Sequence, residues 1–249
     1  MVALSKSEIR VILLDIEGTT TPIDFVNQTL FPYASRKLEA FLREHAGDPE
    51  IRAVIEDLGS QHRSEERQGL QPPAWVDVSE ETRLCSAIAY GQWLIVRDSK
   101  CTPLKSLQGK IWQEGFATGE LRGQVYLDVP RAFKRWRQQQ KLICIYSSGS
   151  VLAQQLLFRT TPSGDLTTYI SGFFDTLVGG KSDVQSYRKI AASLGRAPAE
   201  FLFVSDVVKE VGAAESAGMQ GVLCDRNGKA STSPFASGIV NSFEEVFPD

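Results

Sequence analysis

A continuous apolar run from Val11 to Leu14 constrains the fold of this chain more than any other stretch. A strand that faces water on one side alternates apolar and polar residues, whereas an unbroken apolar run is typical of a strand covered on both faces. Such strands belong to parallel sheets with helices packed on either side. The sequence therefore predicts that residues 11–14 form a buried strand of an α/β domain.

The same kind of apolar run returns in the second half of the chain, alternating there with helical patterns. Further strands are predicted at residues 142–146, 173–178, 201–204 and 221–224, and helices at residues 128–140, 151–159, 183–194 and 211–217. Strands that are joined through helices form right-handed crossovers and therefore a parallel sheet. The predicted fold class is α/β, a Rossmann-like parallel sheet covered by helices on both faces.

Residues 21–125 lack a convincing strand pattern. Apolar residues recur at helical spacing over residues 25–43, 49–67 and 79–97, and Ser79 is the expected N-cap of the third helix. Residues 99–123, which contain three lysines, are expected to form a loop that leads into a short helix. The predicted organisation is an α/β core of residues 1–20 and 126–249, interrupted by an all-helical insertion of residues 21–125.

The charge balance restricts the classes of partner. The chain of 249 residues has 27 Lys and Arg against 30 Asp and Glu, a net charge of −3. This balance gives no electrostatic reason to expect nucleic acid or an anionic membrane, and it favours a small-molecule substrate. No stretch resembles a secretory leader or a transmembrane span, so we expect a cytoplasmic protein.

The cysteines and histidines do not form a recognisable metal or disulfide pattern. The four cysteines lie too far apart in sequence for a zinc site or a disulfide framework, and reduced thiols are expected. The two histidines, His45 and His62, are not at metal-ligand spacing and are expected on the surface. Catalysis is therefore expected to rest on other side chains.

Reactive side chains directly follow four of the predicted strands. They are Asp15 and Glu17 after the first, Ser147 and Ser148 after the second, Lys181 after the third and Asp206 after the fourth. The carboxyl ends of parallel strands lie at one edge of a sheet, where ligands bind, so we expect these side chains to converge. Carboxylates such as Asp15 and Asp206 are hard ligands for Mg²⁺, and Lys181 would neutralise a phosphoryl oxygen. Each motif alone has an ordinary structural explanation, but together they predict a site for magnesium and phosphate.

These motifs resemble those of the haloacid dehalogenase-like hydrolase superfamily, whose first motif is an aspartate nucleophile followed two residues later by a second acid. The resemblance is strongest to one family, the enolase-phosphatases of methionine salvage. It rests on DIEGTTTPI at residues 15–23, LKSLQGKIW at 104–112, IYSSGS at 145–150, Gly180 and Lys181, SYRKI at 186–190 and VSD at 204–206. It therefore covers nearly the whole chain.

The resemblance implies a core of this superfamily with an inserted helical cap that closes over the site and excludes water. It also implies a Mg²⁺-dependent enzyme that enolises 2,3-diketo-5-methylthiopentyl-1-phosphate and then hydrolyses the phosphate. The product would be the acireductone 1,2-dihydroxy-3-keto-5-methylthiopentene. We expect a monomer, and the loop at residues 100–112 is the first candidate for contact with the methylthio tail.

Carried over to this sequence, the resemblance assigns a role to each motif residue. Asp15 is implied to be the nucleophile and Glu17 the general acid/base. The metal ligands would be the carboxylates of Asp15 and Asp206 and the carbonyl of Glu17. Ser147, Ser148 and Lys181 are implied to bind the substrate. The superfamily usually has Asp where this chain has Glu17, which is one methylene longer. Many relatives also carry a second acid close to the position of Asp206. Here Glu210 follows a turn later and is expected to be a solvated helix residue rather than a partner of the metal.

Two other functions agree with parts of the pattern. A plain phosphatase of the same superfamily that acts on another small phosphate ester would need the same four motifs. A phospho-receiver module shares the parallel sheet, the acids and the lysine. Receiver domains are about half as long, however, and lack a long insertion after the first strand.

Overall fold

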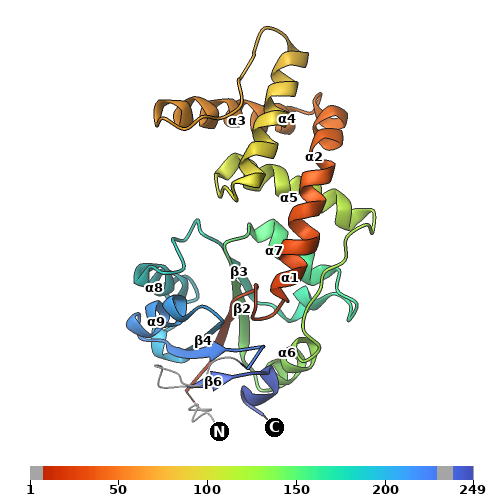
Figure 1. The fold of residues 1–249 in the computed structure, drawn as a ribbon. Coiled ribbons are helices and arrows are strands. Elements are labelled where there is room, and N and C mark those ends of the chain that lie inside the picture. The colour runs from red at the N-terminus through yellow and green to blue at the C-terminus, as the bar shows by residue number, and fades with distance from the viewer. Residues whose placement is uncertain (1–7, 229–237, 249) are drawn as a thin grey trace. The chain divides into compact units, whose positions relative to one another are not determined.

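The computed structural model describes residues 8–228 and 238–248, and the chain divides into two compact units (Figure 1). The core unit comprises Met1–Phe25 and Arg122–Asp249, and the helical unit comprises Val26–Leu121. Among the described residues, no helix combines the length and the apolar character that a membrane span requires.

The core unit is built on one parallel sheet, which confirms the predicted fold class. Its strands are β1 (Val11–Leu14), β2 (Leu142–Tyr146), β3 (Gly172–Phe174), β4 (Phe201–Ser205), β5 (Gln220–Cys224) and β6 (Ile239–Val240), in the order β3-β2-β1-β4-β5-β6. The first strand lies between β2 and β4, since Leu14 pairs with Ile145 on one side and with Val204 on the other. The carboxyl ends of these three strands are therefore level with one another.

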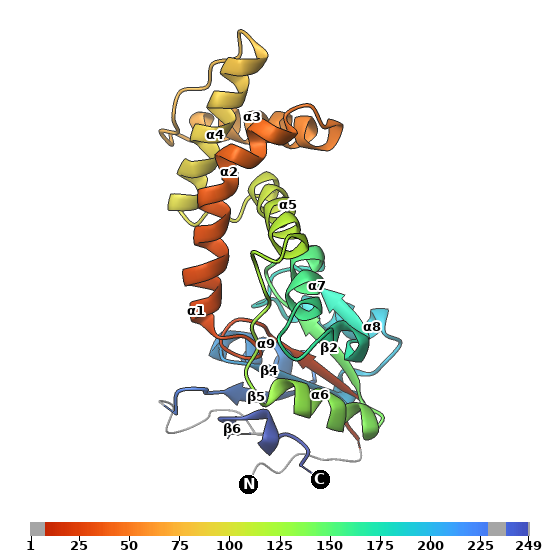
Figure 2. The same cartoon turned by 90° about the vertical axis from the view of Figure 1, so that its right-hand side faces the viewer.

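Helices cover both faces of the sheet (Figures 1 and 2). The core unit contains α1 (Ile23–Phe25), α6 (Val129–Gln138), α7 (Val151–Arg159), α8 (Val184–Ser193) and α9 (Val208–Ser216), with 3₁₀ turns at Leu166–Tyr169, Pro198–Glu200 and Phe243–Glu245. Val11 and Leu13 pack against Tyr187 of α8 and Val211 of α9. All four residues of β1 are fully buried, and each such side chain contributes roughly 1.5–3 kcal/mol. The unbroken apolar run is explained by this two-sided cover.

Two strands differ from the predictions. The third was predicted to run to residue 178 but ends at Phe174. The carboxylate of Asp175 accepts hydrogen bonds from the amides of Leu177 and Val151, so the chain turns there instead of continuing the strand. The last strand, Ile239–Val240, has only two residues and was not predicted, because so short a run carries no periodic signal.

The helical unit contains a π-helix at Val26–Leu30 followed by α2 (Phe31–His45), α3 (Pro49–Arg67), α4 (Glu80–Val96) and α5 (Thr102–Ala117). Ser79 caps α4 as predicted, since its Oγ accepts the Thr82 amide at 3.2 Å. The expectation of a loop followed by a short helix over residues 99–123 was wrong. Leu104, Leu107 and Ile111 are buried at helical spacing along α5, and the surrounding lysines obscured that pattern in the sequence.

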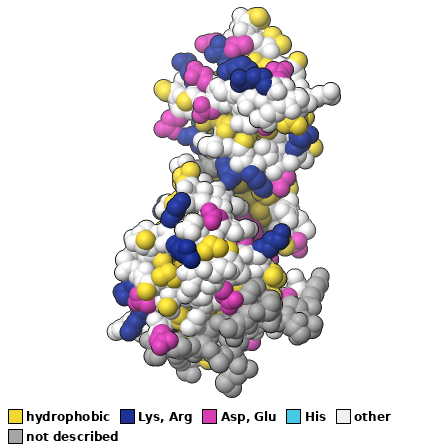
Figure 3. Space-filling view, turned by 90° about the vertical axis from the view of Figure 1, so that its left-hand side faces the viewer, with side chains coloured by type: hydrophobic (Ala, Val, Ile, Leu, Met, Phe, Trp, Pro, Cys, Tyr) yellow, Lys and Arg dark blue, Asp and Glu magenta, His cyan; other side chains and the backbone are white. Residues whose placement is uncertain are grey.

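One histidine of the helical unit is buried, although both histidines were expected on the surface. His62 is 1% exposed, and its Nε2 lies 2.7 Å from the carbonyl oxygen of Pro73. The surface of this unit mixes basic and acidic side chains (Figure 3). Many of them pair across neighbouring elements, as Lys37 does with Glu120 at 2.7 Å. Exposed pairs of this kind contribute at most about 1 kcal/mol each.

Candidate active site

Asp15 stands directly after β1 and is 1% exposed. Its Oδ1 accepts hydrogen bonds from the Ile16 amide at 2.7 Å and from Lys181 Nζ at 2.5 Å. Its Oδ2 lies 2.9 Å from Ser205 Oγ, which donates to it. The carboxylate is thus buried and oriented by groups from the ends of three different segments. Such fixed orientation is what an attacking carboxylate requires.

A tight turn follows Asp15 and brings a second strand end close to it. Gly18 has a φ of +70°, and a β-carbon there would lie 2.1 Å from Asp206 Oδ2. The position therefore excludes every side chain, because the Asp206 carboxylate occupies that space. The Asp206 amide also donates to Thr19 Oγ1 at 3.0 Å. The first and fourth motifs are consequently joined by direct contact.

Lys181 links the third motif to two acids. Besides Asp15, its Nζ contacts Glu210 Oε2 at 2.6 Å. Ser205 Oγ lies 3.0 Å from the same Glu210 oxygen, so its single proton is shared between that oxygen and Asp15. The Glu210 side chain is only 12% exposed. The expectation that Glu210 is a solvated helix residue was wrong, because its carboxylate turns inward to the lysine.

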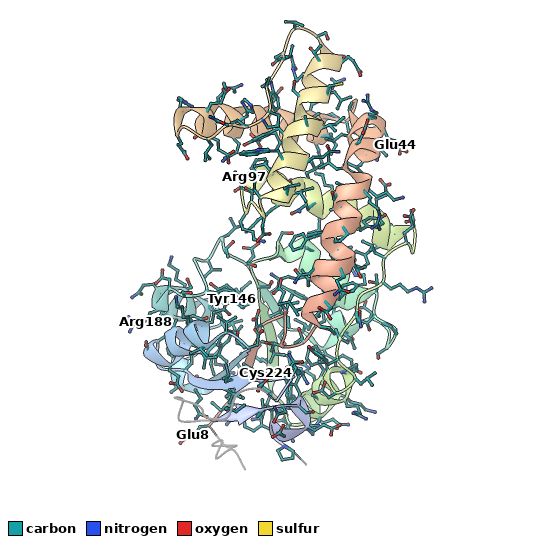
Figure 4. The ribbon with its side chains drawn as sticks, viewed as in Figure 1. Glu8, Glu44, Arg97, Tyr146, Arg188 and Cys224 are labelled. Carbon is teal, nitrogen blue, oxygen red and sulfur yellow. The ribbon has the colours of Figure 1, made fainter. Side chains whose placement is uncertain are left out.

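Two buried tyrosines support the segment that carries Lys181. Tyr146, labelled in Figure 4, donates through its hydroxyl to the Gly179 carbonyl at 2.8 Å. Tyr187 donates in the same way to the Lys181 carbonyl at 2.6 Å. Their rings meet edge to face at 5.6 Å. The sequence motifs contain both tyrosines, but nothing in their spacing indicated that they hold this loop.

The two serines after β2 differ in burial, although the same role was predicted for both. Ser147 is 1% exposed, and its Oγ lies 3.4 Å from Glu17 Oε2, to which it donates. Ser148 is exposed. The N-terminus of α7 is capped by Ser150, whose Oγ accepts the Ala153 amide at 3.3 Å. Ser147 therefore lies beside the first motif, whereas Ser148 is accessible to solvent.

The site holds more acid than base. Burial and the nearby Asp15 charge raise the pKa of Asp206 to about 7, and the same two causes raise the pKa values of Glu17 and Glu210. Burial alone would lower the pKa of Lys181, but the carboxylates of Asp15 and Glu210 outweigh it and raise that pKa. Four acids thus surround one lysine, and a cation would relieve the excess negative charge.

The donor set fits a hard divalent cation. Its side-chain donors are carboxylate oxygens, and the contact of Asp206 with Gly18 places them beside the backbone that follows Asp15. In the described part of the chain, three side-chain ligand atoms come within 4.8 Å of one another only at Glu44, His45 and Glu114 of the helical unit. An ion such as Mg²⁺ usually takes one or two carboxylates and completes its shell with other oxygens and water, and the core site offers carboxylates of this kind.

Comparison with known proteins agrees with this geometry. A family model described as haloacid dehalogenase-like hydrolase matches residues 9–218. The chain is 47% identical to enolase-phosphatase E1 of Synechococcus elongatus, over 96% of this chain and 98% of the relative. It is 43% identical to enolase-phosphatase E1 of Drosophila melanogaster, over 92% of this chain and 88% of the relative.

A solved structure gives the same result for the fold. The crystal structure of the UTR4 protein from Saccharomyces cerevisiae matches with a TM-score of 0.75 and 32% identity, over 96% of this chain and 100% of that chain. The resemblance inferred from the motifs is confirmed. The chain belongs to the haloacid dehalogenase-like hydrolase family and, within it, to the enolase-phosphatase E1 proteins.

Proposed function

We propose that this chain is an acireductone synthase, a bifunctional enolase-phosphatase of methionine salvage. It enolises 2,3-diketo-5-methylthiopentyl-1-phosphate and hydrolyses the phosphate to give the acireductone 1,2-dihydroxy-3-keto-5-methylthiopentene. The enolase-phosphatase E1 relatives, at 43% and 47% identity over most of the chain, support both reactions. The observation that carries the phosphoryl step is the buried Asp15 carboxylate, held by Lys181 and Ser205.

In the phosphoryl step, an Asp15 oxygen forms a bond to phosphorus while the bond from phosphorus to the substrate oxygen breaks. Glu17 gives its proton to that leaving oxygen, and its raised pKa, caused by burial and by Asp15, suits a general acid. Glu17 then accepts a proton from the water that attacks the aspartyl phosphate. Phosphate leaves, and Asp15 is regenerated.

The remaining residues bind and neutralise the phosphate. Lys181 offsets charge on the phosphoryl oxygens, and Ser147 and Ser148 hold the substrate from the end of β2. Hydrolases of this family are generally metal-dependent, and we propose Mg²⁺ as the ion, held by the carboxylates of Asp15 and Asp206 and by the Glu17 carbonyl. When bound, Mg²⁺ supplies charge neutralisation at the phosphoryl group.

We further propose how the chain is organised in the cell. The core unit carries the chemistry, and the helical unit is the cap domain that excludes water during turnover. The enzyme is a cytoplasmic monomer with a small phosphorylated diketone as its partner. The net charge of −3 supports a partner other than nucleic acid or membrane. Light scattering during gel filtration measures the mass of the particle, and a dimer mass would contradict the monomer.

The diketo phosphate itself tests the function. Incubation with Mg²⁺ should release phosphate and produce the ultraviolet absorbance of the enediol, and EDTA should stop both. Glu17→Gln should slow phosphate release by roughly 10²–10⁴-fold, because the variant has no proton to give. Phosphate release without enediol absorbance would contradict the bifunctional enzyme and favour a phosphatase for another small ester.

A further inference from the structure

Arg226 is a buried cation that none of the steps above uses. It lies two residues beyond Cys224, the last residue of β5, which is labelled in Figure 4. Its side chain is 6% exposed. The guanidinium lies 4.3 Å from the ring centroid of Tyr126 and 4.5 Å from that of Phe243. Two aromatic rings therefore keep this group in place and away from water.

The guanidinium donates hydrogen bonds to the turn that follows Asp15. Nε and Nη2 of Arg226 both donate to the Thr19 carbonyl oxygen, at 3.0 and 2.7 Å. Nη1 donates to Asp128 Oδ2 at 2.6 Å. Asp128 in turn accepts the Phe243 amide at 2.6 Å. A planar guanidinium can make all of these contacts at once, which a lysine ammonium cannot.

Thr19 connects the hydrogen bonds of Arg226 to the proposed metal ligands. While its carbonyl is held by Arg226, its Oγ1 accepts the Asp206 amide at 3.0 Å. The next residue, Thr20, has its carbonyl bound by the Tyr126 amide at 3.0 Å, and its Oγ1 lies 3.1 Å from the Asp15 carbonyl. Only one residue thus separates Arg226 from the backbone of Asp206.

From these contacts we propose that Arg226 is a positioning residue, which fixes Thr19 and thereby the backbone of Asp206 in the arrangement that binds the divalent cation. The inference rests on the proposed function in one respect, the use of Asp206 as a metal ligand. Arg226 itself contacts neither substrate nor ion. Its effect passes through a carbonyl and a hydroxyl of the same threonine.

The chain offers a matched control. Arg135 is also an arginine that holds backbone carbonyls, those of Phe243, Val246 and Phe247, at 2.7 to 3.1 Å. None of these carbonyls belongs to the turn after Asp15. Substitution of Arg135 should therefore destabilise the core unit in a similar way without disturbing Asp206.

The experiment compares Arg226→Lys and Arg226→Met with Arg135→Met in the full-length chain. Mg²⁺ affinity is measured from the shift of thermal unfolding with MgCl₂ alone, without substrate. The Arg226 variants should bind Mg²⁺ about 10- to 100-fold more weakly, the usual effect of removing a group that orients a ligand. Arg135→Met should keep the affinity of the parent protein. An equal loss of Mg²⁺ affinity in the Arg226 and Arg135 variants, or no loss in the Arg226 variants, would overturn the proposal.

A second measurement does not depend on metal or activity. Hydrogen exchange of the Asp206 amide should be faster in Arg226→Lys than in the parent protein and unchanged in Arg135→Met. Arg226→Lys keeps this measurement possible if Arg226→Met does not fold, and Thr19→Val, which removes the hydroxyl that accepts the amide, shows the exchange rate expected when the link is lost completely. If the parent protein did not bind Mg²⁺ while the Asp206 amide still exchanged faster in Arg226→Lys, the metal in the proposed function would be contradicted and the role of Arg226 would stand. Unchanged exchange in Arg226→Lys would refute that role.

Discussion

The core unit contains two buried groups of charges that differ in balance. In the pair of Arg226 and Asp128, one cation meets one anion, and the carboxylate also receives the Phe243 amide. At the ends of β1 and β4, four acids lie near Lys181, which forms ion pairs with two of them. Both groups adjoin the turn after Asp15. The balanced pair is complete by itself, whereas the acid-rich group needs a ligand to compensate its charge.

The pKa values of two aspartates express the same difference. Burial opposes ionisation of Asp128, but Arg226 and the Phe243 amide outweigh it and hold the pKa of that carboxyl below its ordinary value. Burial and the charge of Asp15 raise the pKa of Asp206 to about 7. An aspartate with its own arginine thus stabilises the fold. The ionised form of an aspartate beside other acids is destabilised, which is typical of a functional site.

Replacing Asp15 should have the largest effect on activity. Asp15→Asn removes the nucleophile and should abolish phosphate release. The same change removes one negative charge from an acid-rich group, so the metal-free protein should be at least as stable as its parent. Phosphate release and thermal unfolding measure the two effects. Normal turnover would remove Asp15 from the nucleophile role.

Asp128→Asn is the matched substitution in the balanced pair and should behave in the opposite way. It leaves Arg226 buried without its anion, which typically costs about 3–5 kcal/mol of stability. The nucleophile and Lys181 remain in place, so phosphate release per folded molecule should fall far less than in Asp15→Asn. If the two variants lost activity and stability in equal proportion, the contrast between the two groups would be wrong.

Replacing Lys181 should have the next largest effect. Lys181→Met keeps the length of the side chain but removes the one cation that the described residues place among the four acids. Phosphate release at saturating substrate should fall by roughly 10²–10³-fold, since an oriented charge at the phosphoryl oxygens is lost. Addition of Mg²⁺ should stabilise this variant more than the parent protein, which thermal unfolding can measure. An unchanged rate would show that Lys181 only balances charge in the resting site.

The sequence predicted the parts of the site that follow from topology. Asp15 and Asp206 come directly after strands, and Lys181 lies on the loop that follows β3. Parallel strands align their carboxyl ends, so convergence of these residues follows from the strand pattern. Contacts confirm that convergence, because Lys181 touches Asp15 and Asp206 lies against Gly18. Periodicity and strand order are sufficient for this level of detail.

Other parts depend on long side chains whose direction no local pattern records. Glu210 lies in the first turn of α9, on a segment that also contains exposed residues, and contacts with Lys181 and Ser205 hold its carboxylate inward. Arg226 stands in a polar stretch, DRNG at residues 225–228, that reads as an ordinary loop. Its role depends on Thr19, more than two hundred positions earlier. Such pairings arise from tertiary packing, and one sequence does not contain them.

The smallest expected effect is on the pH dependence of stability, and it separates the two groups without a mutation. Asp206 has an ordinary pKa of 3.8 and a folded pKa of about 7. Between these values the folded state binds more protons than the unfolded state, so the free energy of unfolding falls as pH rises from about 4 to about 7. Asp128, whose folded pKa is lowered, contributes in the opposite sense, and its contribution is lost only at acid pH.

Thermal unfolding of the metal-free protein in EDTA, measured from pH 5 to pH 8, tests this expectation. The unfolding temperature should decline toward pH 8 by more in the parent protein than in Asp206→Asn, which has no carboxylate to ionise. Mg²⁺ should remove most of the decline, because the ion stabilises the charged form of Asp206. A decline of equal size in Asp206→Asn would mean that other groups cause it. In that case the acid-rich group would be as well compensated without a ligand as the pair of Arg226 and Asp128.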